Sequence, residues 1–479
     1  MSTRTIVIGG GLAGLAAAHR LATHGLDAQL FEASRTLGGV VGSVDQQGFR
    51  FERAAHTILA GSAAFRRVVD ELGLSPRLER ADPAAKIRWL WHRGKLRALP
   101  AKPSELITTD LLSWTGKRRL LSEPLRSFLP PREGEREPSF GAFLDERIGR
   151  EASRLFAGAF VRGIHAAELD ELGARSAFPR LWALATDHGG ILRGGLARAF
   201  AKKSSLPGPD LPRGALVSFP GGLQELVDAF ASRLGDRVRL GTAVTGIERF
   251  GTRWLVRTAD GRGQVADDVV VATPAPSASR LLARELPRDE LVALRALQHA
   301  SVTLIGLGFA ADALAQFPEG FGYLVPPAED GRASPAPRAL GTIFVTNLFP
   351  QRAPRGARSV AAFYRGTDVA LLDDSALARQ AEADLALAIG CPVPRAIAVH
   401  VERWNDVIPR HAPGHADRVA RIKAVLRERA PGLHVAGAWV GGVAVEQVLT
   451  SGCAAAEDVL QGRNRDRVGF VRGDSEAST

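Results

Sequence analysis

Cysteine is scarce in this chain of 479 residues. Its two cysteines, Cys391 and Cys453, have no paired spacing, so the sequence indicates neither a disulfide framework nor a zinc site. A reducing cytoplasmic compartment fits this usage. No signal peptide is expected, because an apolar strand begins directly after the first four residues. No Ser-His-Asp or Cys-His arrangement indicates another chemistry, and no metal is expected.

Long apolar runs are also missing. None reaches the roughly 18 residues that a membrane-spanning helix needs. The hydrophobic content of 45% and the charged content of 24% are typical of a globular protein, and 479 residues suffice for two or three domains.

Lysine is rare, so arginine carries nearly all of the net charge of +11. The arginines are scattered, without a dense block or neighbouring aromatic residues, and nucleic-acid binding is therefore not expected. An anionic substrate or an anionic membrane surface would also use such a charge.

The first forty residues carry the strongest pattern. The apolar run 5–8 enters Gly9-Gly10-Gly11-Leu12-Ala13-Gly14, a helix-forming stretch follows, and a second apolar run ends in Glu32. This is the dinucleotide-binding fingerprint in its expected order of strand, turn, helix, strand and acid. Gly9 permits the tight turn, Gly11 the approach of a pyrophosphate, and Gly14 close packing of helix on sheet. The helix N-terminus would face the phosphates, and Glu32 would accept from the ribose hydroxyls.

A second glycine pair, Gly38-Gly39, follows the acid. A fold that binds only NAD does not usually need it, whereas a flavin nucleotide that runs deep into the protein would. We therefore expect FAD, bound non-covalently, although a plain turn would also use these glycines.

The rest of the chain predicts a discontinuous architecture of class α/β plus α+β. We expect a Rossmann-like FAD-binding domain, an antiparallel-sheet substrate domain that includes a hairpin around Arg93-Gly94, a helical region and a flexible tail. The predicted bounds are 1–80, 212–283 and 432–462 for the FAD-binding domain, 81–100 and 284–431 for the substrate domain, 101–211 for the helical region, and 463–479 for the tail. A strand is expected over 342–345, and a last helix over about 446–460.

The helical region interleaves apolar and basic residues, among them Trp114, Lys117, Arg118 and Leu121. Such a region either lies on an anionic bilayer or packs one face on the core and solvates the other, and its sequence favours neither. Arg88 is equally open: it is either an exposed strand arginine or a partner for a carboxylate.

The chain resembles the oxygen-dependent protoporphyrinogen oxidases, within the amine-oxidase-like flavoprotein superfamily. The N-terminal motif marks only the superfamily. The more specific resemblance lies in the segments 82–100, 163–167 with Phe178-Pro179, 219–223, 320–326, Ile408-Pro409, Gly414-His415 and 442–445.

This resemblance implies contacts for individual residues. The residues that it places at FAD are Gly9, Gly10, Gly11, Leu12, Ala13, Gly14, Glu32, Ala33, Gly38, Gly39, Val40, His56, Thr57, Val244, Ala272, Gly437, Ala438, Val443, Ala444 and Val445. Arg88 would pair with a substrate propionate, and Leu324 and Phe344 would also contact the substrate. The resemblance further implies a carboxylate-bearing tetrapyrrole as substrate, molecular oxygen as acceptor, hydrogen peroxide as product, and a peripheral position on the cytoplasmic face of an anionic membrane. The oligomeric state is left open, a homodimer included.

The chain departs from the family pattern near the expected substrate pocket. His56 stands in a segment that usually holds Gly-Pro and a polar residue, which makes it a candidate catalytic residue or a structural histidine. Arg365-Gly366 replaces a usual double glycine, Ala167 replaces a glycine, and Val440 replaces a tyrosine. The alternatives are a coproporphyrinogen III oxidase of the same family, a flavin desaturase or an amine oxidase. The absence of lysine between residues 203 and 423 argues against the amine oxidase. A non-enzymatic flavoprotein that binds membranes or nucleic acid is the remaining alternative.

Overall fold

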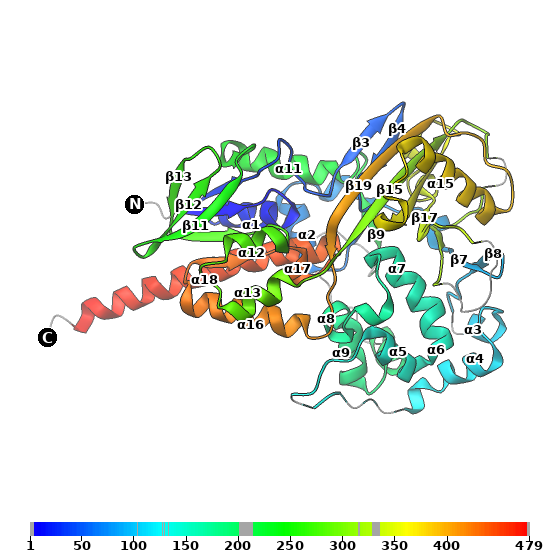
Figure 1. Ribbon diagram of the computed structural model, residues 1–479, viewed down its shortest axis with the longest axis horizontal. Helices are drawn as coiled ribbons and strands as arrows, with labels where there is room; N and C mark the ends of the chain where they lie inside the picture. The colour runs from blue at the N-terminus through cyan, green and yellow to red at the C-terminus, as the bar shows by residue number, and fades with distance from the viewer. Residues whose placement is uncertain are drawn as a thin grey trace.

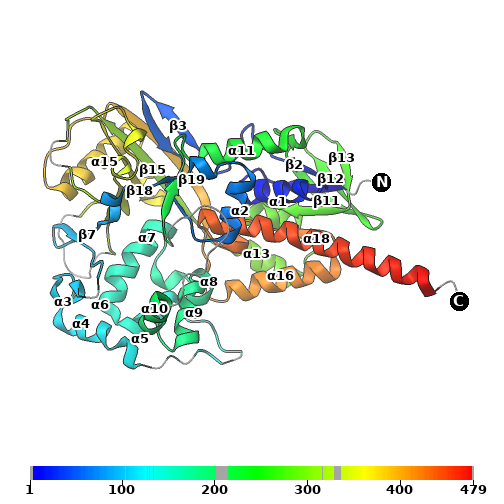
Figure 2. The same ribbon diagram turned by 180° about the vertical axis from the view of Figure 1, so that it is seen from behind.

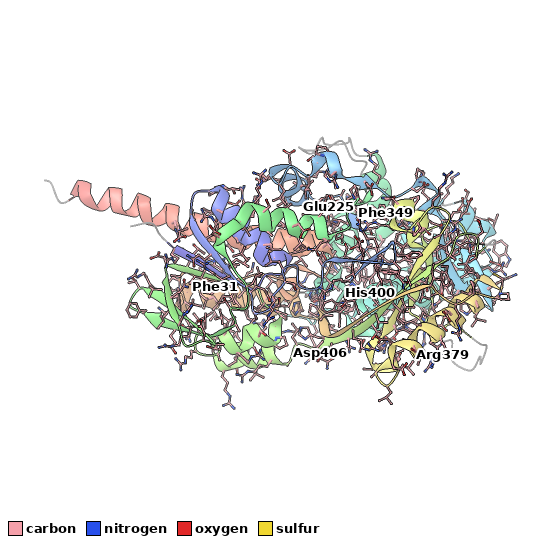
Figure 3. All side chains as sticks on the ribbon, turned by 90° about the horizontal axis from the view of Figure 1, so that it is seen from above. Phe31, Glu225, Phe349, Arg379, His400 and Asp406 are labelled. Atoms are coloured by element: carbon pink, nitrogen blue, oxygen red, sulfur yellow. The ribbon has the colours of Figure 1, made fainter. Side chains whose placement is uncertain are left out.

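The computed structural model describes residues 4–476 apart from 103, 127, 129, 133, 201–213, 315, 316 and 328–335. The predicted boundary at 211/212 and the last three residues of the predicted tail lie outside the described residues. Two sheets lie along the long axis, and a group of helices lies below one of them (Figure 1). Seen from above, Phe31 of the first sheet and Arg379, in the helix that covers the second sheet, lie toward opposite ends of the molecule (Figure 3).

The first sheet is parallel and has the strand order β10-β2-β1-β14-β20. Its strands are β1 (Arg4–Ile8), β2 (Asp27–Phe31), β10 (Val238–Arg239), β14 (Asp268–Val271) and β20 (Leu433–Val435). Both faces are covered, which explains why β1 and β14 are continuous apolar runs rather than alternating ones.

One face packs against α1 (Leu12–Thr23), α2 (Ala63–Glu71), α11 (Gln224–Leu234) and α18 (Val445–Glu476). The other face packs against β11 (Val244–Phe250), β12 (Arg253–Thr258), β13 (Gly263–Ala266), α12 (Ala275–Leu281), α13 (Arg288–Arg295) and α16 (His415–Arg429). Helices α1 and α18 lie side by side (Figure 2). A Cβ on Gly452 of α18 would lie 2.1 Å from the Ala13 carbonyl oxygen, so this close approach requires glycine.

The second sheet has seven strands in the order β19-β15-β18-β17-β16-β7-β8. They are β7 (Arg88–His92), β8 (Lys95–Ala98), β15 (His299–Phe309), β16 (Gly322–Leu324), β17 (Gly341–Ile343), β18 (Arg358–Arg365) and β19 (Ala398–Pro409). All neighbours are antiparallel except β7 and β16, so the sheet is mixed rather than purely antiparallel. The parallel pair arises because the predicted β7–β8 hairpin joins the sheet edge from a distant part of the chain. Helix α15 (Asp374–Ile389) covers one face.

The helical region confirms the mostly helical expectation. Its elements are α3 (Glu105–Thr108), α4 (Trp114–Leu121), α5 (Phe140–Ile148), α6 (Arg150–Ala152), a π-helical segment (Ser153–Gly158), α7 (Ala159–His165), α8 (Ala174–Ala177), α9 (Pro179–His188) and α10 (Ile191–Phe200). Two small sheets complete the fold: β3 (Ser43–Gln46) with β4 (Phe49–Glu52), and β9 (Leu216–Ser218) between β5 (Ile58–Leu59) and β6 (Glu79–Arg80). Among the described residues, no helix combines the length and the apolar character needed to cross a membrane.

Two expectations need correction. Helix α18 does not end near Leu460 but continues to Glu476, so most of the predicted flexible tail is helical. No proline interrupts this segment, and Gly462 alone does not end the helix. The strand expected over 342–345 ends at Ile343, and α14 (Val345–Leu348) follows it.

Candidate active site

Three of the segments predicted to form the nucleotide site meet at one edge of the parallel sheet. Gly9 follows β1, Ala272 follows β14, and Gly437 lies two residues beyond the end of β20. These three strands are neighbours in the sheet. Their carboxyl ends therefore lie together, which is where ligands bind in folds of this type.

The first glycine turn is shaped by contacts that only glycine permits. Gly9 has φ +108°, and a Cβ on it would lie 2.9 Å from the Ala272 carbonyl oxygen. A Cβ on Gly14 would lie 1.8 Å from the Gly9 carbonyl oxygen. Gly11 differs, because no atom lies within 4 Å of its ideal Cβ position. Its side faces open space, as a close approach of pyrophosphate would require.

Helix α1 begins at Leu12, and its N-cap residue Gly11 provides no side chain to bond the first amides. No acidic residue lies in the first turn. The free N–H groups and the positive end of the helix dipole are therefore available to an anion such as a phosphate.

Glu32 closes the side of the turn. Its carboxylate accepts hydrogen bonds from the Gly10 amide at 2.5 Å and from the Ser34 amide at 2.7 Å. The Thr242 amide donates to the Glu32 carbonyl oxygen at 2.8 Å, which brings the start of β11 at Val244 close to this strand. The half-buried carboxylate remains accessible to a ribose hydroxyl, and Ala33 beside it is exposed.

The second glycine turn is tied to the first. The Gly38 amide donates to the Gly10 carbonyl oxygen at 2.9 Å, and Gly38 and Gly39 both have positive φ. Gly39 lies against Gly11, and Val40 is exposed beside them. The two turns thus form one cradle whose donors and open space fit the diphosphate part of a dinucleotide.

Two buried histidines hold the turn after β20. Gly437, with φ +121°, precedes α17 (Ala438–Gly441), and the carbonyl oxygens of Ala438 and Trp439 accept from His411 at 3.1 Å and His415 at 2.7 Å. The two rings stack at 4.5 Å between centroids. Burial lowers the pKa of both rings, that of His411 to about 3, so both donate as neutral imidazoles.

The segment 443–445 follows this turn after Gly442, which has φ +120°. Val443 is half-buried, Ala444 is exposed, and Val445 begins α18. Gly414-His415 was one of the segments that carried the family resemblance, but the sequence assigned no role to His415, and nothing in it pointed to His411.

The second sheet presents two of the three predicted substrate residues, Arg88 and Leu324, on one face. Strand register pairs Arg88 with Gly322 and Ile343, and pairs Leu324 with Gly341 and Phe363. Directly paired residues point to the same side of a sheet. Arg88, Leu324, Ile343 and Phe363 therefore share the face opposite α15.

Phe344 does not lie on this face. Its side chain is fully buried on the α15 side, against Phe317 and Tyr323. Side chains alternate along an extended segment, so its neighbour Ile343 occupies the position expected for Phe344. Arg88 is exposed over the Phe321 ring at 5.5 Å, and it forms no ion pair within the described part of the chain.

His56 lies at the junction of the two sheets. Its ring meets the Phe363 ring edge-on at 5.7 Å, and it lines a small pocket with Ile343 and Arg352. Burial, followed by the charge of Arg352, lowers the pKa of His56 to about 4. The neutral ring donates from Nδ1 to the Ala54 carbonyl oxygen at 3.1 Å, which leaves Nε2 as an acceptor. His56 is therefore a weak base, and the half-buried Thr57 follows it.

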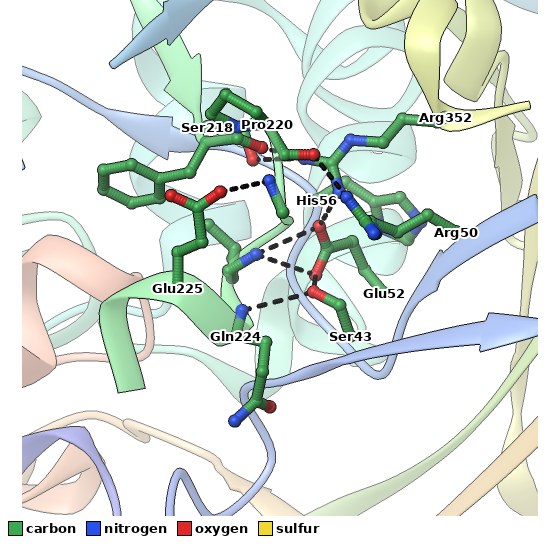
Figure 4. Close-up of polar contacts among 12 residues, drawn as sticks. Ser43, Arg50, Glu52, His56, Ser218, Pro220, Gln224, Glu225 and Arg352 are labelled. Atoms are coloured by element: carbon green, nitrogen blue, oxygen red, sulfur yellow. Dashed lines mark hydrogen bonds and ion pairs between the residues drawn. The ribbon is translucent and has the colours of Figure 1, made fainter. Parts of the chain in front are cut away.

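A buried ion pair lies beside His56 (Figure 4). Arg352 donates to the Glu52 carboxylate at 2.9 Å, and both side chains are almost fully buried. Arg352 also donates to the Ser218 hydroxyl and the Phe219 carbonyl oxygen. The network thus joins β4, β9 and the 3₁₀ turn Pro350–Arg352, three segments far apart in sequence.

The same carboxylate accepts from the Ser43 hydroxyl at 2.7 Å and from the Leu223 amide at 3.2 Å. Gly222 makes room for this arrangement, because a Cβ there would lie 2.0 Å from the Ser43 hydroxyl oxygen. Burial still raises the pKa of Glu52 to about 7. None of these contacts was anticipated from the sequence, although residues 219–223 were recognised as a motif.

A cavity of 290 Å³ lies beside α17 and the start of α18, where the predicted flavin site ends. The buried Glu446 lines it and pairs with Arg180 of α9 at 3.0 Å. This ion pair joins the helical region to the cradle.

Comparison with known proteins now places the chain. A family model described as flavin containing amine oxidoreductase matches residues 12–460. The chain belongs to this family. It is therefore a flavin-dependent oxidoreductase.

Two curated members of the amine oxidoreductase family are similar over most of their length. A chloroplastic protoporphyrinogen oxidase of Oryza sativa is 30% identical, with 96% of this chain and 88% of the relative covered. A coproporphyrinogen III oxidase of Propionibacterium freudenreichii is 29% identical, with 95% and 90% covered. A crystal structure of a protein from Exiguobacterium sp. 255-15, which is named as a protoporphyrinogen oxidase, shares the fold with a TM-score of 0.79. The two sequences are 24% identical, and the match covers 96% of this chain and 99% of that chain.

The open side of Gly11 gives a direct test of the cradle. Gly11→Ala places a methyl group where no protein atom lies, so we expect the apoprotein to fold with an unchanged melting temperature. Flavin affinity should fall about tenfold or more, since about 1.4 kcal/mol of lost contact suffices. Flavin content and calorimetry measure both effects. Gly195→Ala, at a helical glycine that also has open space, is the control: it should leave flavin affinity unchanged and, because alanine favours the helix, should not lower the melting temperature.

Removal of Arg352 should leave the buried Glu52 carboxylate without its cationic partner. We expect Arg352→Met to lower the free energy of unfolding by about 3–5 kcal/mol. Burial raises the pKa of Glu52 in the folded state, so the protein gains stability from keeping this carboxyl neutral. This contribution is fully present below pH 4.5 and is lost as the pH rises through about 7. Without Arg352 this loss deepens, so the variant should be worse relative to wild type at pH 8 than at pH 5.

Unfolding at the two pH values measures this difference. Arg403→Met, which breaks the exposed pair with Asp374, should cost at most about 1 kcal/mol. An equal loss at both pH values would show that Glu52 does not depend on Arg352 for its charge.

Proposed function

We propose that this protein is an FAD-dependent porphyrinogen oxidase that converts protoporphyrinogen IX to protoporphyrin IX, with molecular oxygen as acceptor and hydrogen peroxide as product. Coproporphyrinogen III is the alternative substrate. The observation that carries the proposal is the sheet face that holds Leu324, Ile343 and Phe363, with Arg88 at one end, in a chain that also has a dinucleotide cradle. The similarity to relatives named for both porphyrinogens supports it.

FAD, bound non-covalently, would supply hydride acceptance from the reduced tetrapyrrole. The chain's own residues bind and orient the substrate. Leu324, Ile343 and Phe363 offer an apolar floor for a macrocycle, and Arg88 offers a bidentate donor to a propionate. His56, neutral and buried, offers Nε2 as a hydrogen-bond acceptor to a substrate N–H rather than presenting a charge. The proposal includes the predicted division of the chain into an FAD-binding domain, a substrate domain and a helical region.

Turnover tests the proposal directly. The flavin-loaded protein should form fluorescent porphyrin aerobically from protoporphyrinogen IX or from coproporphyrinogen III, faster than autoxidation. Formation of porphyrin at only the autoxidation rate, with both substrates, would contradict it and direct attention to desaturase substrates.

Arg88 should contribute to substrate affinity and not to flavin binding. We expect Arg88→Ala to raise KM by about tenfold, because a charge-assisted hydrogen bond to a carboxylate contributes about 1.5–3 kcal/mol. The flavin spectrum should be unchanged. Lys95→Ala, an exposed cation on the neighbouring strand β8, should leave KM unaltered. An unchanged KM in Arg88→Ala would remove this residue from the substrate site.

We also propose a peripheral position on the cytoplasmic face of an anionic membrane. Trp114, Arg118 and Leu121 lie at helical spacing on one face of α4, and Trp114 is 77% exposed. Ile107 and Leu125, also exposed, lie in the neighbouring segments. Apolar side chains beside arginines suit the interface of an anionic bilayer.

The membrane proposal predicts sedimentation with anionic vesicles and not with neutral ones. The double variant Trp114→Glu, Leu121→Glu should bind anionic vesicles about tenfold more weakly, because it removes apolar burial in the bilayer and adds charge repulsion. The control Leu371→Glu changes a fully exposed leucine elsewhere and should have no effect. Equal binding of wild type and the double variant would contradict the proposal.

A further inference from the structure

Two arginines share one carboxylate next to the substrate face. Arg365, at the end of β18, donates to Glu168 at 2.7 Å, and Arg162 of α7 lies 3.6 Å from the same carboxylate oxygen. Arg162 also donates to the Pro326 carbonyl oxygen at 3.1 Å. Asp368 acts on Arg162 from farther away, without an ion pair among the described residues. The paired contacts thus bring together two cations and one anion.

The guanidinium groups are not fully satisfied. The Nε atoms of Arg162 and Arg365 are both buried and have no hydrogen-bond partner among the described residues, although the Arg162 Nε is the atom that lies 3.6 Å from the Glu168 carboxylate. The side chains themselves are about a quarter exposed or less, and Glu168 is 40% exposed. A buried N–H without an acceptor is costly, so this group of side chains would be stabilised by a further anion that brings acceptors.

The position of Arg365 relates this group to the substrate face. Arg365 lies two residues beyond Phe363 on β18, so both side chains leave the same side of the strand. Helix α7 packs against this side of the sheet, because a Cβ on Gly163 would lie 2.5 Å from the Leu324 side chain. Arg365 therefore belongs to the same face as Arg88 and Leu324.

Arg88 and Arg365 lie at opposite ends of this face. They are separated by three strand spacings across the sheet and by four residues along it, which corresponds to roughly 20 Å between their Cα atoms. Leu324, Ile343 and Phe363 lie between them. Two long cationic side chains thus flank an apolar floor.

We propose that Arg365, beside Arg162, is a second carboxylate-binding position for the substrate, where a substrate carboxylate competes with Glu168 for the guanidinium group. This rests on the proposed function and, between its two substrates, favours the alternative, coproporphyrinogen III, over protoporphyrinogen IX. Protoporphyrinogen IX carries its two propionates on one edge of the macrocycle and vinyl groups on the other. Coproporphyrinogen III carries propionates on both edges, so only it has charges for both Arg88 and Arg365. The arrangement therefore favours the tetracarboxylate.

Binding of the oxidised porphyrins tests this without turnover. The flavin-loaded protein is titrated with coproporphyrin III and with protoporphyrin IX, and Kd is read from the perturbation of the porphyrin and flavin spectra. Arg365→Ala should raise Kd for coproporphyrin III about tenfold and leave Kd for protoporphyrin IX within about twofold. Arg365→Lys should give an intermediate Kd, since it keeps the charge but loses the fork.

Two further variants separate binding from a structural role. Glu168→Gln removes the competing carboxylate, so it should tighten coproporphyrin III binding, whereas a merely structural ion pair would weaken it. Arg358→Ala changes an arginine of the same strand that lies over Phe317 on the α15 side, and it should alter neither Kd. These variants also keep the test decisive if Arg365→Ala fails to fold.

The outcomes distinguish the two proposals. Equal losses for both porphyrins in Arg365→Ala, or no loss, would overturn the role of Arg365 and leave the oxidase proposal standing. Failure of the wild-type protein to bind or oxidise any porphyrin would overturn both.

Discussion

The buried ion pair between Glu52 and Arg352 is the contact on which the placement of the proposed substrate face depends. Two charges removed from water must satisfy each other and their remaining donors and acceptors, and this requirement leaves little freedom in geometry. Arg352 comes from the turn before β18, Glu52 from the hairpin after the nucleotide motif, and the loop 218–223 closes around both. Since His56 lies four residues after Glu52, the pair also sets the position of His56 against Phe363.

Glycine has two distinct uses in the cradle. Gly9, Gly14 and Gly452 allow parts of the protein to approach one another, whereas Gly11 leaves space that the protein does not fill. The first use holds α1 between the sheet and α18. The second use leaves room for a ligand, and the uncapped start of α1 supplies its donors. Packing and ligand binding are therefore separable at neighbouring positions of one motif.

Local pattern was sufficient to predict the nucleotide half of the protein. The run of strand, glycine turn, helix and acid lies within 32 residues, and Gly9 has the positive φ that its tight turn requires. The β7–β8 hairpin was equally local. Phe344 was placed on the wrong side of its segment because side-chain direction depends on strand register, which only the assembled sheet defines.

The contacts that shape the site could not be read from the sequence because they join distant residues. Glu52 and Arg352 are 300 positions apart, and the histidines that hold α17 follow β19 rather than the motif that they support. The sequence showed Arg365 only as a departure from a glycine pair. The structure adds that Arg365 and Arg162 share the carboxylate of Glu168, which the sequence could not show. The extension of α18 to Glu476 was missed because the polar composition of residues 462–479 suggested a frayed end, although no proline there stops the helix.

The central claim is that a porphyrinogen bound on the sheet face donates hydride to a flavin held in the cradle. Mixing of the flavin-loaded protein with coproporphyrinogen III in the absence of oxygen tests this most directly. The account predicts loss of the visible flavin absorbance together with the appearance of porphyrin, and recovery of the flavin band when oxygen is admitted. A flavin band that stays oxidised while the porphyrinogen remains unchanged would contradict it.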